Sequence, residues 1–309
     1  MKRIAIIGAG LIGQSWAIVF ARAGYEVRMW DGNPQVLPTA LQIVTQQLQM
    51  LHENGLVEAP EDAAHRVQVF EELETALEGV IYVQESLPEN LDIKKQVFAS
   101  LDAAAASDTI LASSTSSIPA SHFTESLPGR GRCLVAHPVN PPYLIPVVEL
   151  CAAEWTSSDT MARTRELMLD IGQKPVSVYG EPRGFVLNRL QGALLREAFR
   201  LVEKGNVSVE DLDTTIKDGL GLRWSFMGPF ETIDLNAPGG VQDYCDRYGE
   251  MYRAMAEEQT STEAWPADLV AAIHGQRREQ LDEAELEARR FWRDDYLMSL
   301  LRLKQARKE

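Results

Sequence analysis

The stretch from Ile4 to Gly13 reads Ile-Ala-Ile-Ile-Gly-Ala-Gly-Leu-Ile-Gly and decides the fold. Its first four residues form an apolar strand pattern, and the glycines follow with the spacing Gly-x-Gly-x-x-Gly. An amphipathic helical pattern comes next, over Leu11–Ala23. Glycines alone also mark ordinary turns. A strand before them and a helix after them indicate instead a loop that binds the phosphates of a dinucleotide.

Each glycine of the motif has a separate physical task. Gly8 permits the tight turn, Gly10 lets a pyrophosphate approach the backbone, and Gly13 allows the helix to pack closely on the strand. Asp31 ends a second strand pattern about 20 residues further on, where a carboxylate can accept hydrogen bonds from ribose hydroxyls. Its charge would repel the 2′-phosphate of NADP, and no Arg or Lys follows closely. We therefore predict NAD as the cofactor, bound by Gly8, Gly10, Leu11, Ile12, Gly13 and Asp31.

Short apolar runs alternate with amphipathic stretches through the first part of the chain. This alternation is typical of βαβ units and a parallel sheet, so the fold class predicted is α/β with a Rossmann-type domain. The expected helices cover Leu11–Ala23, Val36–Glu53, Leu91–Leu101 and Thr160–Ile171. The expected strands are Ile4–Ile7, Glu26–Trp30, Val67–Phe70, Val80–Val83, Thr109–Ala112, Cys133–Ala136, Val147–Leu150 and Pro175–Val178.

After Gly180 the strand patterns stop and helical patterns take over. A long helix is expected over Gly184–Lys204, and Ser208 can cap the next helix, with Asp211 placed like the acidic member of a capping box. We predict an NAD-binding Rossmann domain over residues 1–182, and an all-α domain for substrate binding and dimerisation over residues 183–309.

Composition excludes several classes of function. The chain has 309 residues, a formal net charge of −15 and a pI of about 4.9, which argues against a nucleic-acid partner. No apolar run is long enough for a membrane span. The three cysteines are far apart, so neither a disulfide framework nor a metal site is predicted, and a cytoplasmic location is expected.

Polar residues gather where predicted strands and one helix begin or end. They are the serine run Ser113–Ser117, His137, Glu149 and Asn188. Oxidation of an alcohol needs a base for the hydroxyl proton, and a neutral histidine held by a carboxylate suits that task. Ser and Asn can hydrogen-bond the substrate oxygen as its charge changes. On the residues alone, an ordinary loop and a structural histidine are equally open interpretations.

Longer passages carry a resemblance to a known family. The chain resembles the 3-hydroxyacyl-CoA dehydrogenase superfamily over its whole length, and within it the lambda-crystallin and L-gulonate 3-dehydrogenase branch. The passages are His137–Tyr143, Gly184–Gln191, Glu203–Asp213, Leu235–Ala237, Tyr244–Tyr248 and Trp292–Asp294.

The resemblance implies roles for individual residues. His137 matches the general base, Glu149 its carboxylate partner, and Ser116 and Asn188 the polar residues near the reacting atoms. Asn140, in the same segment as His137, is expected near the substrate. Glu89 and Lys94 match a cofactor-side pair, although the spacing alone fits an exposed charge pair on a helix equally well.

One departure from the family concerns the substrate. Members that act on acyl-CoA usually carry His-Phe-Phe-Asn-Pro, whereas this chain has His-Pro-Val-Asn-Pro from His137 to Pro141. Arg223 could bind a free carboxylate through two of its guanidinium nitrogens; a surface or dimer-interface arginine is the alternative.

The expected activity is therefore NAD-dependent oxidation of a small 3-hydroxy acid to the 3-keto acid by a homodimer. L-Gulonate is the substrate favoured, with L-carnitine and 3-hydroxybutyryl-CoA as alternatives. A non-catalytic, crystallin-like NAD-binding protein is the alternative from another class.

Overall fold

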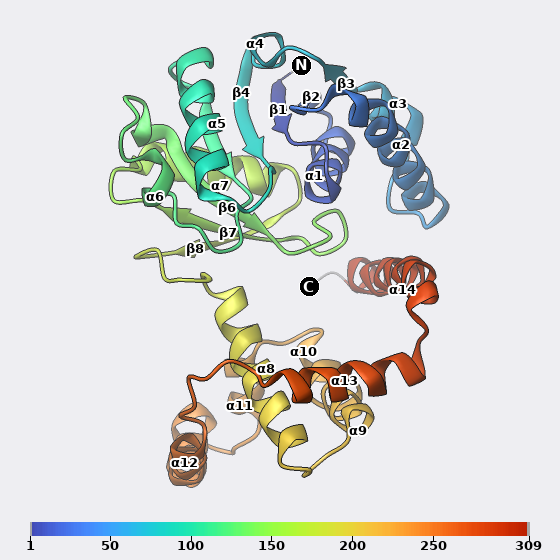
Figure 1. The fold of residues 1–309 in the computed structure, drawn as a ribbon, viewed down its shortest axis with the longest axis vertical. Helices are drawn as coiled ribbons and strands as arrows, with labels where there is room; N and C mark the ends of the chain where they lie inside the picture. Colours follow the sequence, from blue (N-terminus) through green and yellow to red (C-terminus); the bar gives the residue numbers. More distant parts are fainter. Residues whose placement is uncertain (1, 308–309) are drawn as a thin grey trace. The chain divides into compact units, whose positions relative to one another are not determined.

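A computed structural model describes residues 2–307 and divides the chain into two compact units. The first contains residues 1–189 together with residues 290–309, and the second contains residues 190–289. Figure 1 shows the order of their helices and strands along the chain.

The first unit is built on one eight-stranded sheet with the order β3-β2-β1-β4-β5-β6-β7-β8. The strand order reverses direction between β1 and β4, which is the point where such sheets bind a dinucleotide. The strands are β1 (Arg3–Ile7), β2 (Glu26–Trp30), β3 (Val67–Phe70), β4 (Val80–Glu85), β5 (Ile110–Ser113), β6 (Cys133–Pro138), β7 (Val147–Ala152) and β8 (Lys174–Val178). All eight predicted strands are confirmed; β2 and β3 match in both bounds, and the others differ by one or two residues at one or both ends.

The expectation of a wholly parallel sheet is wrong at one place. Strands β6 and β7 pair in antiparallel fashion, and all the other pairs are parallel. The connection between β6 and β7 is too short to hold the crossover helix that a parallel pair needs. The chain therefore turns back on itself after Pro138.

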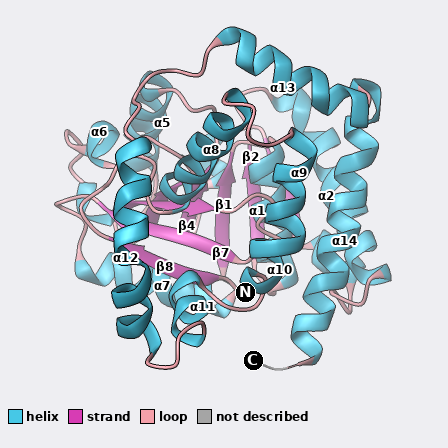
Figure 2. Ribbon diagram, turned by 90° about the horizontal axis from the view of Figure 1, so that it is seen from below, coloured by secondary structure: helices cyan, strands magenta, loops and turns pink. Residues whose placement is uncertain are grey.

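Helices cover both faces of the sheet (Figure 2). The core on one face includes side chains of α1, α2, α3, α7 and α14, and the core on the other includes side chains of α5 and α6. The bounds are α1 (Leu11–Arg22), η1 (Pro34–Val36), α2 (Leu37–Glu53), α3 (Pro60–His65), α4 (Leu73–Ala76), α5 (Leu91–Ala104), α6 (Ser121–Thr124), η2 (Arg130–Arg132) and α7 (Ser158–Asp170).

The last helix, α14 (Leu286–Ala306), returns to the first unit from residue 290 onward. Met298 is fully buried in the core that contains α1 and α2, and Asp294 accepts a hydrogen bond from the Tyr143 hydroxyl at 3.2 Å. The division at residues 182 and 183 stays a prediction. The compact units differ from it, because they divide inside α8 (Leu187–Glu203) and assign the last residues to the first unit.

Helices alone make up the described secondary structure of the second unit. They are the rest of α8, α9 (Val209–Thr214), η3 (Thr215–Leu220), α10 (Gly221–Trp224), α11 (Pro229–Leu235), α12 (Gly240–Glu258), α13 (Ala267–Gln280), η4 (Glu283–Glu285) and the first residues of α14. The predicted cap is confirmed, since Ser208 Oγ accepts a hydrogen bond from the Asp211 backbone N–H at 3.0 Å. Within residues 2–307, none of the helices has both the length and the apolar character that crossing a bilayer requires.

Candidate active site

The glycine loop connects β1 to α1 and has the geometry that a bound dinucleotide requires. Gly8 has φ of +109°, a backbone conformation that L side chains rarely adopt. A Cβ on Gly13 would lie 1.8 Å from the Gly8 carbonyl oxygen, so helix and strand approach too closely for any side chain. At Gly10 a Cβ would meet nothing within 4 Å, which leaves open space beside the first turn of α1. These residues fit an incoming pyrophosphate.

Asp31 follows β2 and is tied to the same loop. One of its carboxylate oxygens accepts a hydrogen bond from the Ala9 backbone N–H at 2.8 Å, and the other accepts one from Asn33 N–H at 2.9 Å. Each carboxylate oxygen can accept more than one hydrogen bond. Asp31 therefore keeps acceptor capacity for ribose hydroxyls while it fixes the loop.

His137 and Glu149 lie directly opposite each other in the antiparallel pair of β6 and β7. The imidazole Nδ1 is 2.8 Å from Glu149 Oε2, and both side chains are buried. Among residues 2–307, His137 Nε2 has no hydrogen-bond partner. The carboxylate thus orients the ring and leaves one nitrogen for another group.

The second oxygen of Glu149 connects this pair to the start of α8. Oε1 accepts hydrogen bonds from the backbone N–H groups of Val186 at 2.8 Å and Leu187 at 2.9 Å. Burial raises the pKa of Glu149, but the hydrogen bonds from His137, Leu187 and Val186 together outweigh that effect. The net pKa lies below the ordinary value, so Glu149 is a carboxylate at neutral pH.

Asn188, one residue further along α8, contacts the serine loop that follows β5. Its side-chain N–H donates to the Ser116 carbonyl oxygen at 2.9 Å. Glu89 holds the same loop from the other side, since one of its oxygens accepts from the Thr115 hydroxyl at 2.6 Å and from Ser117 N–H at 2.9 Å. Burial raises the pKa of Glu89, but these hydrogen bonds and the charge of Lys94 give a net lowering.

Lys94 has a closer partner than the sequence indicated. Its ammonium lies 3.0 Å from a carboxylate oxygen of Glu85 and 3.9 Å from Glu89, and Glu85 and Lys94 are both almost completely buried. Ser113 also donates its hydroxyl to Glu85. The sequence analysis missed Glu85, although a carboxylate at the end of an apolar strand and nine residues before a lysine was an available signal.

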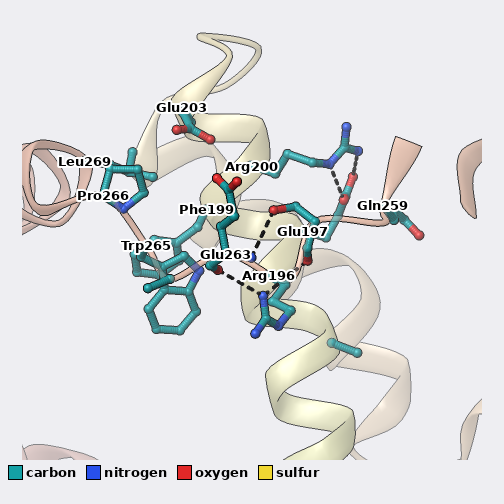
Figure 3. A pocket seen from close by; sticks show the side chains of 13 residues that line it. Arg196, Glu197, Phe199, Arg200, Glu203, Gln259, Glu263, Trp265, Pro266 and Leu269 are labelled. Atoms are coloured by element: carbon teal, nitrogen blue, oxygen red, sulfur yellow. Dashed lines mark hydrogen bonds and ion pairs between the residues drawn. The ribbon is translucent and has the colours of Figure 1, made fainter. Parts of the chain in front are cut away.

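Two predicted residues remain apart from these contacts. Asn140 is exposed on the connection after β6. Arg223 belongs to α10 in the second unit, where its Nε is buried and has no hydrogen-bond partner within residues 2–307. Figure 3 shows a pocket of that unit, lined by residues of α8, α13 and the segment between α12 and α13. None of the predicted site residues lines this pocket.

The contacts of the first unit join a buried histidine and its carboxylate partner to the start of α8, and join Asn188 there to the serine loop after β5. This combination suits proton transfer from an alcohol beside a bound dinucleotide. Within the described part of the chain, no group of three His, Cys, Asp or Glu residues is arranged to hold a metal ion.

Comparison with known proteins assigns the class. The family described as 3-hydroxyacyl-CoA dehydrogenase matches twice, through its NAD binding domain over residues 3–181 and its C-terminal domain over residues 184–279. Rabbit (Oryctolagus cuniculus) lambda-crystallin is 41% identical over 306 residues, which cover 97% of this chain and 96% of the relative. L-Carnitine dehydrogenase from Streptomyces coelicolor is 38% identical, covering 81% of this chain and 78% of that protein.

A solved structure agrees in both fold and sequence. The crystal structure of 5-formyl-3-hydroxy-2-methylpyridine 4-carboxylic acid 5-dehydrogenase superposes with a TM-score of 0.85 and 30% identity, covering 99% of each chain. Sheet, glycine loop and comparisons together define an NAD-dependent oxidoreductase that acts on CH–OH groups. The chain belongs to the 3-hydroxyacyl-CoA dehydrogenase family.

Proposed function

We propose that this enzyme oxidises a small free 3-hydroxy acid to the 3-keto acid with NAD, and that L-gulonate is its substrate. The observation that carries the proposal is the His137–Glu149 pair, with Nε2 of the imidazole left without a partner. NAD, when bound, supplies the hydride acceptor.

In this proposal His137 takes the hydroxyl proton of the substrate at Nε2. The Nδ1 atom donates to Glu149, whose charge stabilises the imidazolium that forms. Asn188 and Ser116, joined by a hydrogen bond of 2.9 Å, position the substrate oxygen. Glu89 orients the loop of Ser116 through Thr115 and Ser117.

Two observations favour a free acid over a CoA thioester. His137 is followed by Pro-Val-Asn-Pro instead of Phe-Phe-Asn-Pro. The relatives with 30% identity or more include dehydrogenases named for carnitine and for a pyridine 4-carboxylic acid, and both compounds carry a free carboxylate. A 3-hydroxybutyryl-CoA dehydrogenase shares only 26% identity and covers 81% of this chain. L-Carnitine is therefore the second candidate, and 3-hydroxybutyryl-CoA the third.

We propose that Arg223 binds the substrate carboxylate. Asn140, on the segment after His137, is proposed separately as a substrate-binding residue. The support for Arg223 is its buried Nε, which has no partner within residues 2–307. An unpaired buried donor is costly, and a bound carboxylate would satisfy it.

A purely structural, crystallin-like role is less well supported. A protein kept only for its fold has no use for a buried histidine–carboxylate pair with an open ring nitrogen, because burying such groups costs stability. We further propose that the enzyme is a cytoplasmic homodimer formed through the helical domain, where many large apolar side chains are exposed.

The test is a substrate panel. L-Gulonate, L-carnitine, 3-hydroxybutyrate and 3-hydroxybutyryl-CoA are each assayed with NAD by the absorbance of NADH. The proposal expects the highest kcat/KM with L-gulonate. A preference for the CoA thioester would reject the free-acid assignment, and no turnover with any hydroxy compound would favour the structural role.

A further inference from the structure

A partly buried hydrogen-bond network lies where β4 and β5 end, and the glycine motif and the His137–Glu149 pair do not account for it. It joins Trp16 of α1, Tyr82 and Gln84 of β4, Ser86 after β4, and Ser114 after β5. Ser86 stands where β1 and β4 end side by side, because its N–H donates to the Ile7 carbonyl at 2.7 Å.

The orientation of the Gln84 amide is fixed by its surroundings. Its Nε2 lies 3.2 Å from the Ala136 carbonyl oxygen, which can only accept, so the nitrogen and not the oxygen must face it. The other N–H of this amide then donates to Ser114 Oγ at 2.7 Å. The amide oxygen accepts the Tyr82 hydroxyl proton at 2.5 Å.

The direction in which the Ser114 hydroxyl donates its proton is also fixed. Its hydroxyl oxygen accepts from Gln84 and also from the Trp16 indole N–H at 3.2 Å, and an indole N–H can only donate. Two donors occupy both lone pairs of the oxygen. The Ser114 proton must therefore point to Ser86 Oγ, which lies 2.9 Å away.

The Ser86 hydroxyl is left as a donor without an acceptor. It receives the Ser114 proton, and within residues 2–307 no acceptor lies in hydrogen-bond distance of its own proton. The side chain is half-buried, and the Ser86 carbonyl oxygen lies 2.7 Å from the position that a Cβ on Gly8 would take. The Ser86 hydroxyl is thus an oriented donor without an acceptor. It lies beside the glycine loop, between β1 and β4, where the order of the strands reverses.

We propose that Ser86 is a cofactor-binding residue whose hydroxyl donates to the nicotinamide-side phosphate or the nicotinamide ribose of NAD. Asp31 lies after β2, so the adenosine ribose belongs on that side of β1. The remainder of the dinucleotide must cross β1 toward β4 and β5, on the way to Ser116 and His137. Phosphate oxygens and ribose hydroxyls are the acceptors that it brings past Ser86.

The test measures binding by calorimetry with three probes, namely NADH, ADP-ribose and AMP. Ser86→Ala is expected to lower the affinity for NADH and for ADP-ribose by roughly three- to tenfold, the usual effect of one lost hydrogen bond. AMP lacks the nicotinamide-side phosphate and the nicotinamide-side ribose, which are the groups proposed to meet Ser86, and should bind as before. Ser86→Cys keeps the shape of the side chain but replaces the hydroxyl by a weaker donor, so it should also lower the affinity for NADH and for ADP-ribose.

Ser100→Ala is the matched control, because Ser100 is exposed on α5 and its hydroxyl bonds only to its own helix at Gln96. It should bind all three probes like the unmodified protein. Unchanged ADP-ribose affinity in both Ser86 variants would overturn the proposal. An equal loss for AMP would also overturn it, because the hydroxyl would then serve the adenosine side.

Discussion

His137 Nδ1 lies 2.8 Å from Glu149 Oε2, and the two residues face each other across the antiparallel pair of β6 and β7. The two residues face each other because the chain turns back after Pro138 and β7 pairs with β6 in antiparallel fashion. The connection between the two strands is too short for a parallel pair. The carboxylate binds one ring nitrogen and leaves Nε2 without a hydrogen-bond partner among residues 2–307. The catalytic proposal therefore depends on the single antiparallel step in the sheet.

Cofactor choice provides the first prediction. Asp31→Asn removes the charge that would repel a 2′-phosphate but keeps the size of the side chain. The ratio of kcat/KM with NAD to that with NADP should fall more than tenfold, because hydrogen bonds to a charged acceptor contribute about 1.5–3 kcal/mol. Steady-state kinetics with both cofactors measures the ratio. Glu71→Gln, an exposed change before α4, is the control, and an unchanged ratio for Asp31→Asn would remove Asp31 from the cofactor site.

Acid stability provides the second prediction. The folded state lowers the pKa of Glu149, so its stabilising contribution is complete above the ordinary carboxyl pKa of about 4.3 and is lost as pH falls through the folded-state value. Glu149→Gln should therefore be less stable than the unmodified protein at pH 7, and this difference should shrink as the pH is lowered below about 4. Urea unfolding across that range measures it. A difference that stays constant with pH would contradict the argument.

Assembly provides the third prediction. Helix α12 exposes Tyr248, Met251, Tyr252 and Met255 at helical spacing, which forms one apolar face. We expect a homodimer in sedimentation at micromolar concentration, and Met251→Lys should shift it toward monomer. Gln242→Lys adds the same charge on the polar face of α12 and should leave the dimer intact. A monomeric unmodified protein would contradict the prediction.

Most of the fold could be predicted because the signals are local. Alternating apolar runs located the eight strands, and Gly8 to Asp31 predicted the cofactor loop within one segment. The direction of β7 was missed because parallel and antiparallel strands have the same side-chain period, although the short connection after β6 would have excluded a parallel pair. Strand β4 was predicted to end at Val83 because Gln84 and Glu85 are polar, yet both are fully buried.

The contacts missed by sequence reasoning are those between distant residues. Tyr143 and Asp294 are 151 positions apart, and nothing local to either residue indicates their hydrogen bond. Ser86 was missed because its hydroxyl partner, Ser114, is 28 positions away and follows another strand. Glu85 is the exception, because its partner Lys94 is only nine positions away. The role of Arg223 stays a prediction for a different reason, since Arg223 belongs to the second unit and the His137–Glu149 pair to the first.

Substrate binding provides the fourth prediction. Arg223→Ala should raise KM or lower kcat for the free hydroxy acid so that kcat/KM falls more than tenfold, because a lost charge-assisted contact costs about 1.5–3 kcal/mol. The affinity for NADH should stay the same. Arg247→Ala is a matched control in the same unit, where Arg247 is exposed and paired with Asp243. If both variants keep normal kinetics, Arg223 does not bind the substrate carboxylate.

The last prediction concerns the mechanism. His137→Gln removes the proposed base and should lower kcat by about 10²–10⁴-fold, the usual contribution of positioned proton transfer. Glu149→Gln should also lower kcat, because a neutral amide cannot stabilise an imidazolium as a carboxylate does. NADH affinity should change little in either variant, since the glycine loop and Asp31 are untouched.

The double variant distinguishes a coupled pair from two independent residues. If Glu149 acts only through His137, then His137→Gln with Glu149→Gln should lose little more than His137→Gln alone, far less than the product of the two single losses. The measurements are kcat and kcat/KM across pH for the three variants, with NADH affinity determined separately and thermal unfolding checking that each folds. Near-normal turnover by His137→Gln would reject the proposed base. Fully multiplicative losses would show that both residues matter without forming a functional pair, and the 2.8 Å contact would then be structural only.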